Sequence, residues 1–402
     1  MIAEKERMLD EKWKKWGPYV SNRQWGTVRE DYSSNGNAWG HTTYSDAISR
    51  AYRWSEDGIA GICDSKQRLC FAFSFWNRKD KMIKERFFGL SNHEGNHGED
   101  VKELYYYLDN TPTHSYMKMV YKYPIQEFPY DELVAENGRR SKHDPEFELL
   151  DTGIFNDNNY FDIFIEYAKI NHDDFLIRIV VENRSTQKAP LVILPTIWFR
   201  NNWNWGHGNY EPQLKSSVNG VINIDHHSIP LKRLYSRDQS SIALFCNNET
   251  NPAKILNTVS SAKFFKDGIN DFLIQNNTNA INKDQCGTKA CFLIDTEIEA
   301  KGSKIFEFRL SPHEMEDAFF NFDDIFSLRE AEANEFYSSI QREINDEEEK
   351  NVQRQAFAGL LWNKQFYHYN VSKWLKGDIK SENPRNFNHY VRNTEWEHMQ
   401  NK

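Results

Sequence analysis

The densest group of side chains that could do chemistry lies in a glycine-rich stretch at 89–100. Gly95 and Gly98 would let its polar groups approach another surface closely, because glycine has no side chain to keep it away. Two interpretations stay open: a loop that projects carboxylates and amides into a cleft, or a structural loop whose polar groups bond one another. We expect the first, with substrate contacts from Glu94, Asn96, His97, Glu99 and Asp100.

The same stretch contains the string His93-Glu94-Gly95-Asn96-His97, which has the spacing of a zinc-protease motif. That chemistry needs a regular helix that places both histidines on one face beside the metal. Each glycine costs a helix about 1 kcal/mol relative to alanine, and no apolar helical period flanks the string. We therefore expect no metal site and no cofactor, and a zinc hydrolase remains a minor alternative.

A second group combines an aromatic ring with charged side chains in the segment Trp25-Gly-Thr-Val-Arg-Glu-Asp-Tyr32. Its members could line a sugar pocket or form a surface turn with exposed ion pairs, each worth less than about 1 kcal/mol. The segment at 52–58 has a similar composition, and there we favour a structural role. For the first segment the two interpretations are balanced, and the candidates for substrate binding are Trp25, Arg29, Glu30 and Asp31.

A third aromatic group, Trp198-Phe-Arg-Asn-Asn-Trp-Asn-Trp205, follows an apolar run and reads as the end of a strand with Trp/Asn turns. Such turns suit contacts with sugars, because a flat apolar ring with a polar edge stacks on a sugar face. An edge that packs against another domain is the more common explanation for this pattern. The whole chain is 14% aromatic, with 12 Trp, 19 Tyr and 27 Phe, and most of these rings must belong to the core.

The composition narrows the class of protein. The chain has 402 residues with 39% hydrophobic and 27% charged side chains, which is typical of a globular protein large enough for a sizeable core. Its 50 basic and 59 acidic residues give a net charge of −9, which argues against generic binding of nucleic acid. No apolar run approaches the ~18 residues of a membrane span.

The N-terminal residues 1–15 are charged and lack the apolar stretch of a secretory signal. The five cysteines are an odd number without CxxC spacing, so we expect reduced thiols that mostly fill the core. Together these features predict a cytoplasmic protein.

The apolar pattern predicts β structure from about residue 69 to 310. Phe71, Phe73 and Phe75 alternate with small residues, and the runs 160–170 and 175–182 alternate around a turn at 171–174. Many strands separated by Asn, Gly and Asp turns predict a mainly β fold, a large antiparallel sandwich. Further strands are expected at 104–108, 116–121, 191–199, 242–245, 291–298 and 304–310.

The pattern changes near residue 320. A helix with an apolar stripe is predicted over 323–344, and the acidic residues 346–349 predict the start of a second helix that continues to about 375. The apolar residues of the second helix go most of the way round, which is typical of a helix buried among others. We therefore divide the chain into a β-sandwich domain at 1–320, a linker helix at 321–345 and the incomplete start of a helical domain at 346–402.

Long strings of this sequence resemble the N-terminal half of glucosidase-like proteins related to glycoside hydrolase family 63. The resemblance extends from about Trp13 to Trp396. It is carried by the strings Lys15-Trp-Gly-Pro-Tyr19, Gln24-Trp-Gly-Thr-Val-Arg-Glu-Asp-Tyr32, Glu94-Gly-Asn-His-Gly-Glu-Asp-Val-Lys102, Thr111-Pro-Thr-His-Ser-Tyr-Met117, Leu194-Pro-Thr-Ile-Trp-Phe-Arg200 and Gln355-Ala-Phe-Ala-Gly-Leu-Leu-Trp-Asn-Lys-Gln-Phe366.

The resemblance implies a β super-sandwich packed on an (α/α)6 barrel, and hydrolysis of α-glycosidic bonds with inversion. An inverting site needs a carboxylic acid and a carboxylate base ~6.5–9.5 Å apart. In the family both lie on the barrel, and the first follows the position that matches Trp396. No residue of this chain matches either of them, so we assign no catalytic residue.

The leading hypothesis is therefore the N-terminal portion of an inverting α-glycosidase that acts on α-glucosides or oligosaccharides and is inactive alone. Its expected partners are an α-glucoside substrate and a barrel half encoded separately, with neither nucleic acid nor membrane. The alternative is a non-catalytic carbohydrate-binding β-sandwich protein.

Overall fold

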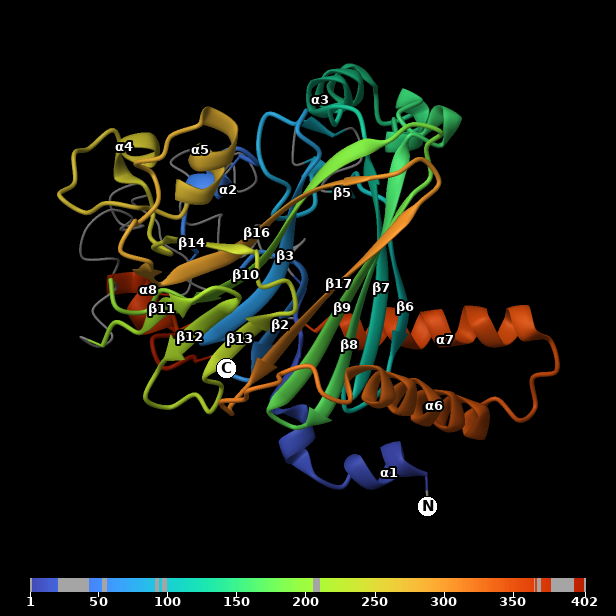
Figure 1. The fold of residues 1–402 in the computed structure, drawn as a ribbon. Helices are drawn as coiled ribbons and strands as arrows, with labels where there is room; N and C mark the ends of the chain where they lie inside the picture. The colour runs from blue at the N-terminus through green and yellow to red at the C-terminus, as the bar shows by residue number, and fades with distance from the viewer. Residues whose placement is uncertain are drawn as a thin grey trace.

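The structure is a computed structural model that describes residues 2–20, 43–52, 56–90, 94–95, 100–204, 210–364, 366, 370–376 and 394–400. Antiparallel strands form most of its regular structure, as the alternating sequence patterns predict, and they build two large sheets (Figure 1). A small third sheet pairs β4 (Gly89–Leu90) with β5 (Asp100–Val101).

The first sheet has six strands, and β10 lies inside it between β3 and β16. The order across the sheet is β1 (Trp16–Pro18), β2 (Ile59–Asp64), β3 (Leu69–Trp76), β10 (Ala189–Phe199), β16 (Lys289–Ile298) and β14 (Ile242–Cys246).

The second sheet has nine strands, and its middle is a long hairpin whose residues Ile165 and Ile179 are paired. The order is β15 (Cys286–Gly287), β11 (Gln213–Val218), β12 (Val221–Asp225), β13 (Arg233–Ser236), β17 (Ser303–Ser311), β9 (Asp174–Asn183), β8 (Tyr160–Asn171), β7 (Tyr116–Pro124) and β6 (Tyr105–Asn110).

The two sheets share one apolar core, which confirms the mainly β fold. Phe71, Phe73 and Phe75 of β3 are fully buried in the same cluster as the inward residues of β9. Strand residues alternate between the two faces of a sheet, so each strand of this kind sends one row of side chains into the shared core. The row from β9, predicted as one face, is Phe175, Ile177, Ile179 and Val181.

Strand β10 is buried on both faces. Ile193 and Ile197 face the core between the sheets, whereas Val192 and Leu194 pack on the outer side with Ile269 of helix α5 (Gly268–Gln275). A strand covered on both faces needs apolar side chains at consecutive positions, which explains the continuous apolar run in its sequence.

The remaining helices are short, except for two near the C-terminal end of the described chain. Of the five cysteines, four are buried, and none is paired in a disulfide. No helix in the described ranges is long and apolar enough to cross a membrane. The short elements are α1 (Ala3–Arg7), η1 (Glu11–Lys15), α2 (Asp46–Ser49), α3 (Tyr130–Arg139), η5 (Leu149–Thr152), η6 (Asn156–Asn158), α4 (Pro252–Ile255) and α8 (Val371–Lys376).

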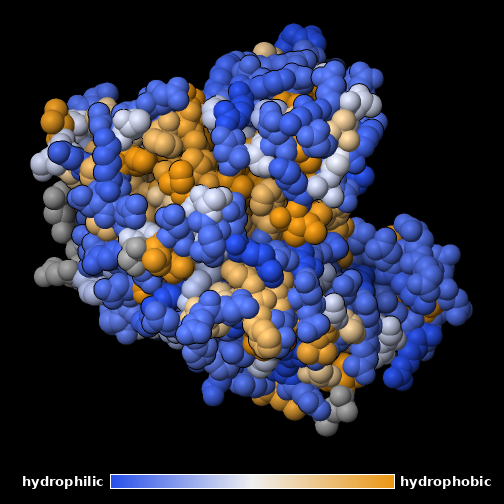
Figure 2. Space-filling model, in the orientation of Figure 1, coloured by the Kyte–Doolittle hydropathy of each residue, from blue (hydrophilic) through white to orange (hydrophobic). Residues whose placement is uncertain are grey.

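The two long helices are α6 (Phe322–Ile340) and α7 (Glu347–Trp362), which lie side by side beyond one side of the nine-stranded sheet (Figure 1). The tip that joins them is charged and exposed, and Figure 2 shows it as hydrophilic. Helix α7 begins as predicted, with Asp346 accepting hydrogen bonds from the amides of Glu348 and Glu349.

The second helix is shorter than the sequence predicts, because α7 ends at Trp362 and α8 is a separate element. The carbonyl of Lys364 accepts a hydrogen bond from the amide of Val20 at 2.8 Å, and the Lys364 ammonium lies 3.3 Å from Nε2 of His114. The backbone leaves the helical path at Asn363, where ψ is 38°, and these contacts then hold the next residue against distant parts of the chain.

Trp362 fixes α7 to the nine-stranded sheet. Its side chain is 2% exposed, it stacks on Tyr107 with 5.2 Å between ring centroids, and its indole donates to the carbonyl of Asp109 at 3.0 Å. Leu360, two residues earlier, is 74% exposed. The packing of α7 therefore depends on the first side chain and not on the second.

We predict that Trp362→Ala lowers the free energy of unfolding by about 3–5 kcal/mol, because it opens a cavity and leaves the Asp109 carbonyl without its donor. The matched control Leu360→Ala should change it by less than about 0.5 kcal/mol. Denaturation in urea, followed by circular dichroism, measures both. Equal effects of the two substitutions would show that α7 does not pack as described.

Candidate functional site

Most of the residues predicted to contact substrate lie outside the described residues. This holds for Trp25, Arg29, Glu30, Asp31, Asn96, His97 and Glu99, and also for His93 of the zinc string. Glu94 lies in a two-residue described segment and is partly exposed, and Asp100 lies on β5. A shared pocket formed by these two segments, and the zinc hypothesis, both stay predictions.

Asp100 takes part in an ion-pair cluster around a buried ammonium. Lys102 is 1% exposed, and its Nζ lies 2.5 Å from Asp100, 2.6 Å from Glu146 and 3.0 Å from Glu148. Burial lowers the pKa of Lys102, but its hydrogen bonds to these carboxylates raise it overall, so the group is charged. The three carboxylates are close enough together to hold a metal ion, and the lysine already supplies the positive charge there.

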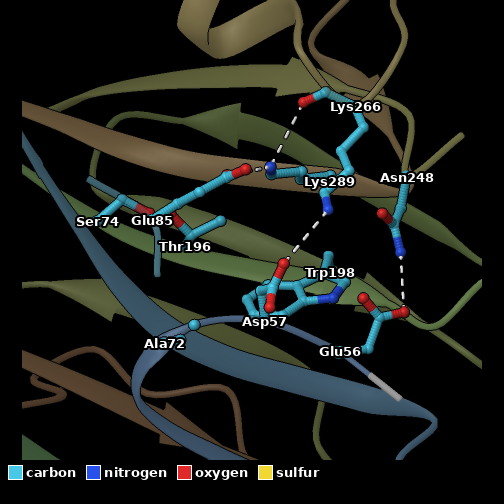
Figure 3. Close-up of a pocket in the computed structure, with 11 residues that line it drawn as sticks. Glu56, Asp57, Ala72, Ser74, Glu85, Thr196, Trp198, Asn248, Lys266 and Lys289 are labelled. Atoms are coloured by element: carbon cyan, nitrogen blue, oxygen red, sulfur yellow. Dashed lines mark hydrogen bonds and ion pairs between the residues drawn. The ribbon is translucent and has the colours of Figure 1, made fainter. Parts of the chain in front are cut away.

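The C-terminal end of β10 borders two hollows. The first is a small buried cavity of about 20 Å³, room for about one water molecule (Figure 3). Side chains from β3, β10 and β16 meet there with the segment before β2. The lining residues are Glu56, Asp57, Gly58, Ala72, Ser74, Glu85, Thr196, Trp198, Asn248, Lys266 and Lys289.

The cavity holds several charges that are only partly paired. Asp57 lies 3.9 Å from the ammonium of Lys266 and 4.0 Å from the guanidinium of Arg86, and neither of its carboxylate oxygens has a hydrogen-bond partner among the described residues. Glu85 accepts from Lys289 at 3.1 Å through one oxygen. A water molecule in the cavity could donate to Asp57, which is the usual way to satisfy a buried carboxylate of this kind.

Glu56 is the most perturbed carboxyl of this cavity. It is 1% exposed and accepts a hydrogen bond from Asn248 at 3.3 Å. Burial raises the pKa of Glu56 to about 7, although the positive charges of Lys266 and Arg200 oppose that rise. The group can therefore exchange a proton near neutral pH, but the cavity has no room for a sugar ring. Its chemistry is limited to water and protons.

The second hollow is an open cleft of about 220 Å³ beyond the end of β10. It lies where the turn before β3, the segment after β10, the segment before β11 and the turn after β12 come together. The lining residues are Arg68, Phe199, Arg200, Asn202, Trp203, Tyr210, Pro212, His226, His227 and Ser228.

The cleft joins aromatic rings to hydrogen-bonding groups. The indole of Trp203 donates to Glu249 at 3.2 Å, and the hydroxyl of Tyr210 accepts from the amide of His227 at 3.2 Å, so both rings are held by their polar edges. The His227 ring lies 4.4 Å from the Tyr210 ring and 4.8 Å from the ring of His226. Rings held in this way can pack against one face of a small cyclic ligand.

Sequence reasoning found one part of this cleft and missed the rest. The aromatic run 198–205 indicated a turn suited to sugars, and Asn202 and Trp203 do line the cleft, whereas Trp205 lies outside the described residues. Arg68 and the turn 226–228 come from distant parts of the chain with no local motif. Only the pairing of the strands brings them to the end of β10.

Comparison with known proteins finds a longer relative of this chain by sequence. No family model matches it. An uncharacterized protein of Saccharomyces cerevisiae, YMR196W, is 38% identical to it over 452 aligned positions, which include 99% of this chain and 41% of the relative. The chain thus spans about two fifths of the length of the curated relative it matches.

Among solved structures, one described as a kojibiose phosphorylase from the human microbiome overlaps 78% of this chain and 36% of its own, with 6% identity and a TM-score of 0.26. A likeness this low supports no conclusion about fold or function.

The buried Glu56 makes a testable contribution to stability. Its carboxyl has a pKa near 4.5 when the chain is unfolded and about 7 when it is folded. Below pH 4.5 both states are protonated. Between pH 4.5 and 7 only the unfolded state releases the proton, so this group destabilises the folded protein as the pH rises.

We predict that Glu56→Gln removes this loss, which amounts to up to about 3 kcal/mol at 1.36 kcal/mol per pKa unit. The quantity to measure is the free energy of unfolding of both proteins at pH 4.5, 6 and 8. The difference in free energy of unfolding in favour of the variant should grow up to about pH 7 and stay constant above it. A difference that does not vary with pH would contradict the assignment.

Proposed function

We propose that this chain is the N-terminal, non-catalytic portion of an inverting α-glycosidase that acts on α-glucosides. The proposal draws on the long strings that resemble glucosidase-like proteins related to glycoside hydrolase family 63, and on the β-sandwich that accompanies them. Both catalytic carboxylates would lie in a helical domain that follows the sandwich. The segment 346–402 would begin that domain, 321–345 would link it to the sandwich at 1–320, and we expect the protein in the cytoplasm.

The observation that carries the proposal is the outer face of α7. Val352 and Leu360 are 62% and 74% exposed, and Ala356 between them is exposed too. Residues four apart share one face of a helix, so these three form an apolar stripe. The inner face, with Ala358 and Trp362, is already buried on the sheet.

A helix that is apolar on two opposite sides needs a second layer of packing to remove the outer side from water. Gly359 has no neighbouring atom within 4 Å of the place where a side chain would begin, so another helix could approach the backbone closely there. Helices of a following domain are the occupants that this geometry suits. In the yeast relative the matching region belongs to one longer polypeptide, so the proposal needs no separately encoded half.

The two segments at 25–31 and 94–100 would form one wall of the sugar site in the complete enzyme. Their charged and amide groups, with the ring of Trp25, suit hydrogen bonds and stacking with a glucoside. The proton donor and the base that activates water would come from the helical domain, ~6.5–9.5 Å apart as inversion requires.

The second candidate function is a carbohydrate-binding β-sandwich without catalysis, and the open aromatic cleft at the end of β10 favours it. The two candidates differ in what happens when the helical domain is supplied. A binding module would gain no activity, whereas a glycosidase fragment would.

We predict that the chain alone hydrolyses maltose and aryl α-glucosides no faster than buffer does. A chimera in which this chain replaces the matching region of the yeast relative should release glucose, and proton NMR should detect the β anomer first. The intact yeast protein is the positive control. If that control is active, an inactive chimera contradicts the proposed equivalence, and a first product in the α form contradicts inversion.

In an active chimera, Arg29→Ala or Glu99→Ala should lower kcat/KM by about 10- to 150-fold, which corresponds to one hydrogen bond of about 1.5–3 kcal/mol to a charged group. The melting temperature should change little. Glu94→Ala, in the same loop as Glu99, is a third variant in which to measure kcat/KM and the melting temperature. Variants that unfold while the surviving fraction keeps full activity would identify these residues as structural and not as part of the site.

A further inference from the structure

We propose that the cleft at the end of β10 binds a single saccharide ring that carries one anionic group, a carboxylate or a phosphate. The inference does not depend on hydrolysis. It rests on four observations within the described residues: a guanidinium with a free edge, a buried imidazole in one fixed form, the composition of the lining and the size of the cleft.

Arg68 is fixed by its own contacts yet keeps one edge available. Its Nε donates to Asp64 at 3.0 Å and its Nη1 donates to the hydroxyl of Ser228 at 2.7 Å. Its Nη2 has no partner within the described part of the chain, and the side chain is 27% exposed. A guanidinium that is held in place and still offers two N–H donors is well suited to an anionic oxygen.

His226 offers a second fixed donor. It is 8% exposed, and its Nδ1 accepts a hydrogen bond from the amide of Ser228 at 3.1 Å. A neutral imidazole that accepts at Nδ1 carries its proton at Nε2, and Nε2 has no hydrogen-bond partner among the described residues. Burial, His227 and Arg68 lower the pKa of His226 to about 4, so this form persists at neutral pH.

The lining of the cleft is rich in donors and contains no carboxylate among the described residues. Of the acids around the cleft, Asp64 is engaged with Arg68 and Glu249 with the indole of Trp203, whereas the exposed Glu211 lies between the lining residues Tyr210 and Pro212. Arg200 adds a second positive charge, and its Nε donates to the carbonyl of Gln67 at 3.0 Å.

Such a lining favours a sugar that carries an anionic group over a neutral one. Both have hydroxyls that donate and accept, but only the anionic group adds an acceptor that carries a negative charge. That group matches the donors of Arg68, His226 and the Asn202 amide, and hydrogen bonds to a charged group are the stronger ones.

The shape of the cleft limits the rest of the ligand. Trp203 and Tyr210 line the cleft, and an aromatic ring there can pack against the flat apolar side of a pyranose. A volume of about 220 Å³ is below the roughly 300–1,000 Å³ of common ligand pockets. The cleft therefore has room for one ring with its charged substituent.

Isothermal titration of the full chain with four probes tests the inference: glucuronate, glucose 6-phosphate, glucose and inorganic phosphate. We expect at least one of the two charged sugars to bind about tenfold or more tightly than glucose and inorganic phosphate, and its affinity to fall as salt is added. Which of the two binds better identifies the anionic group. Glucose binding as tightly as the charged sugars would overturn the role of the anion, and inorganic phosphate binding as tightly would overturn the role of the ring.

Variants locate the site. Arg68→Gln should weaken binding of the charged sugar by about tenfold or more, because a hydrogen bond to a charged group is lost. The control Arg233→Gln, on β13, removes a charge that is paired with Glu314. It should change the affinity less than about twofold. Asn202→Leu should weaken binding of the charged sugar by about fivefold or more. This variant tests the site if Arg68→Gln does not fold, because the Asn202 side chain makes no hydrogen bond among the described residues whose loss would destabilise the protein. Unchanged affinity in folded Asn202→Leu would overturn the assignment.

Discussion

The burial of β10 on both faces is the constraint on which the arrangement of this molecule depends. One row of its side chains fills the core between the sheets, and the other row is covered by α5 and its neighbours. No polar side chain can sit along such a strand without a partner, so the polar and charged groups collect where the strand ends. Thr196, Trp198 and Arg200 mark that transition from apolar strand to polar end.

Two different environments result at that end. On the outer face of the six-stranded sheet, away from the core between the sheets, Glu56 and Asp57 are enclosed with lysine and arginine cations around a cavity of the size of one water molecule. Beyond the end of the strand, Arg68 and His226 are held in place by hydrogen bonds to Ser228 and open onto a cleft lined by aromatic rings. The first environment adjusts protonation and stability, and the second presents donors to a ligand. The helices on another side of the molecule serve a third purpose, which is packing.

The sequence predicts the fold well because its strands have strong local signals. The alternation in 160–170 and 175–182 requires one buried face, and that face is fully buried in the structure. Local patterns did not predict the end of α7 at Trp362, where the nearby residue Lys364 bonds to the distant Val20. They also missed the cleft, since Arg68 and His226 come from turns that only the pairing of strands brings together. The predicted segments 25–31 and 96–99 lie outside the described residues.

The central claim is that this sandwich binds an anionic sugar in the cleft at the end of β10, whereas hydrolysis belongs to another domain. A crystal structure of the chain grown with glucuronate or glucose 6-phosphate tests it most directly. We predict that the ligand lies in the cleft with its anionic group within hydrogen-bonding distance of Arg68 Nη2 and His226 Nε2, and with its ring against Trp203. A ligand bound elsewhere with the cleft empty would contradict the account.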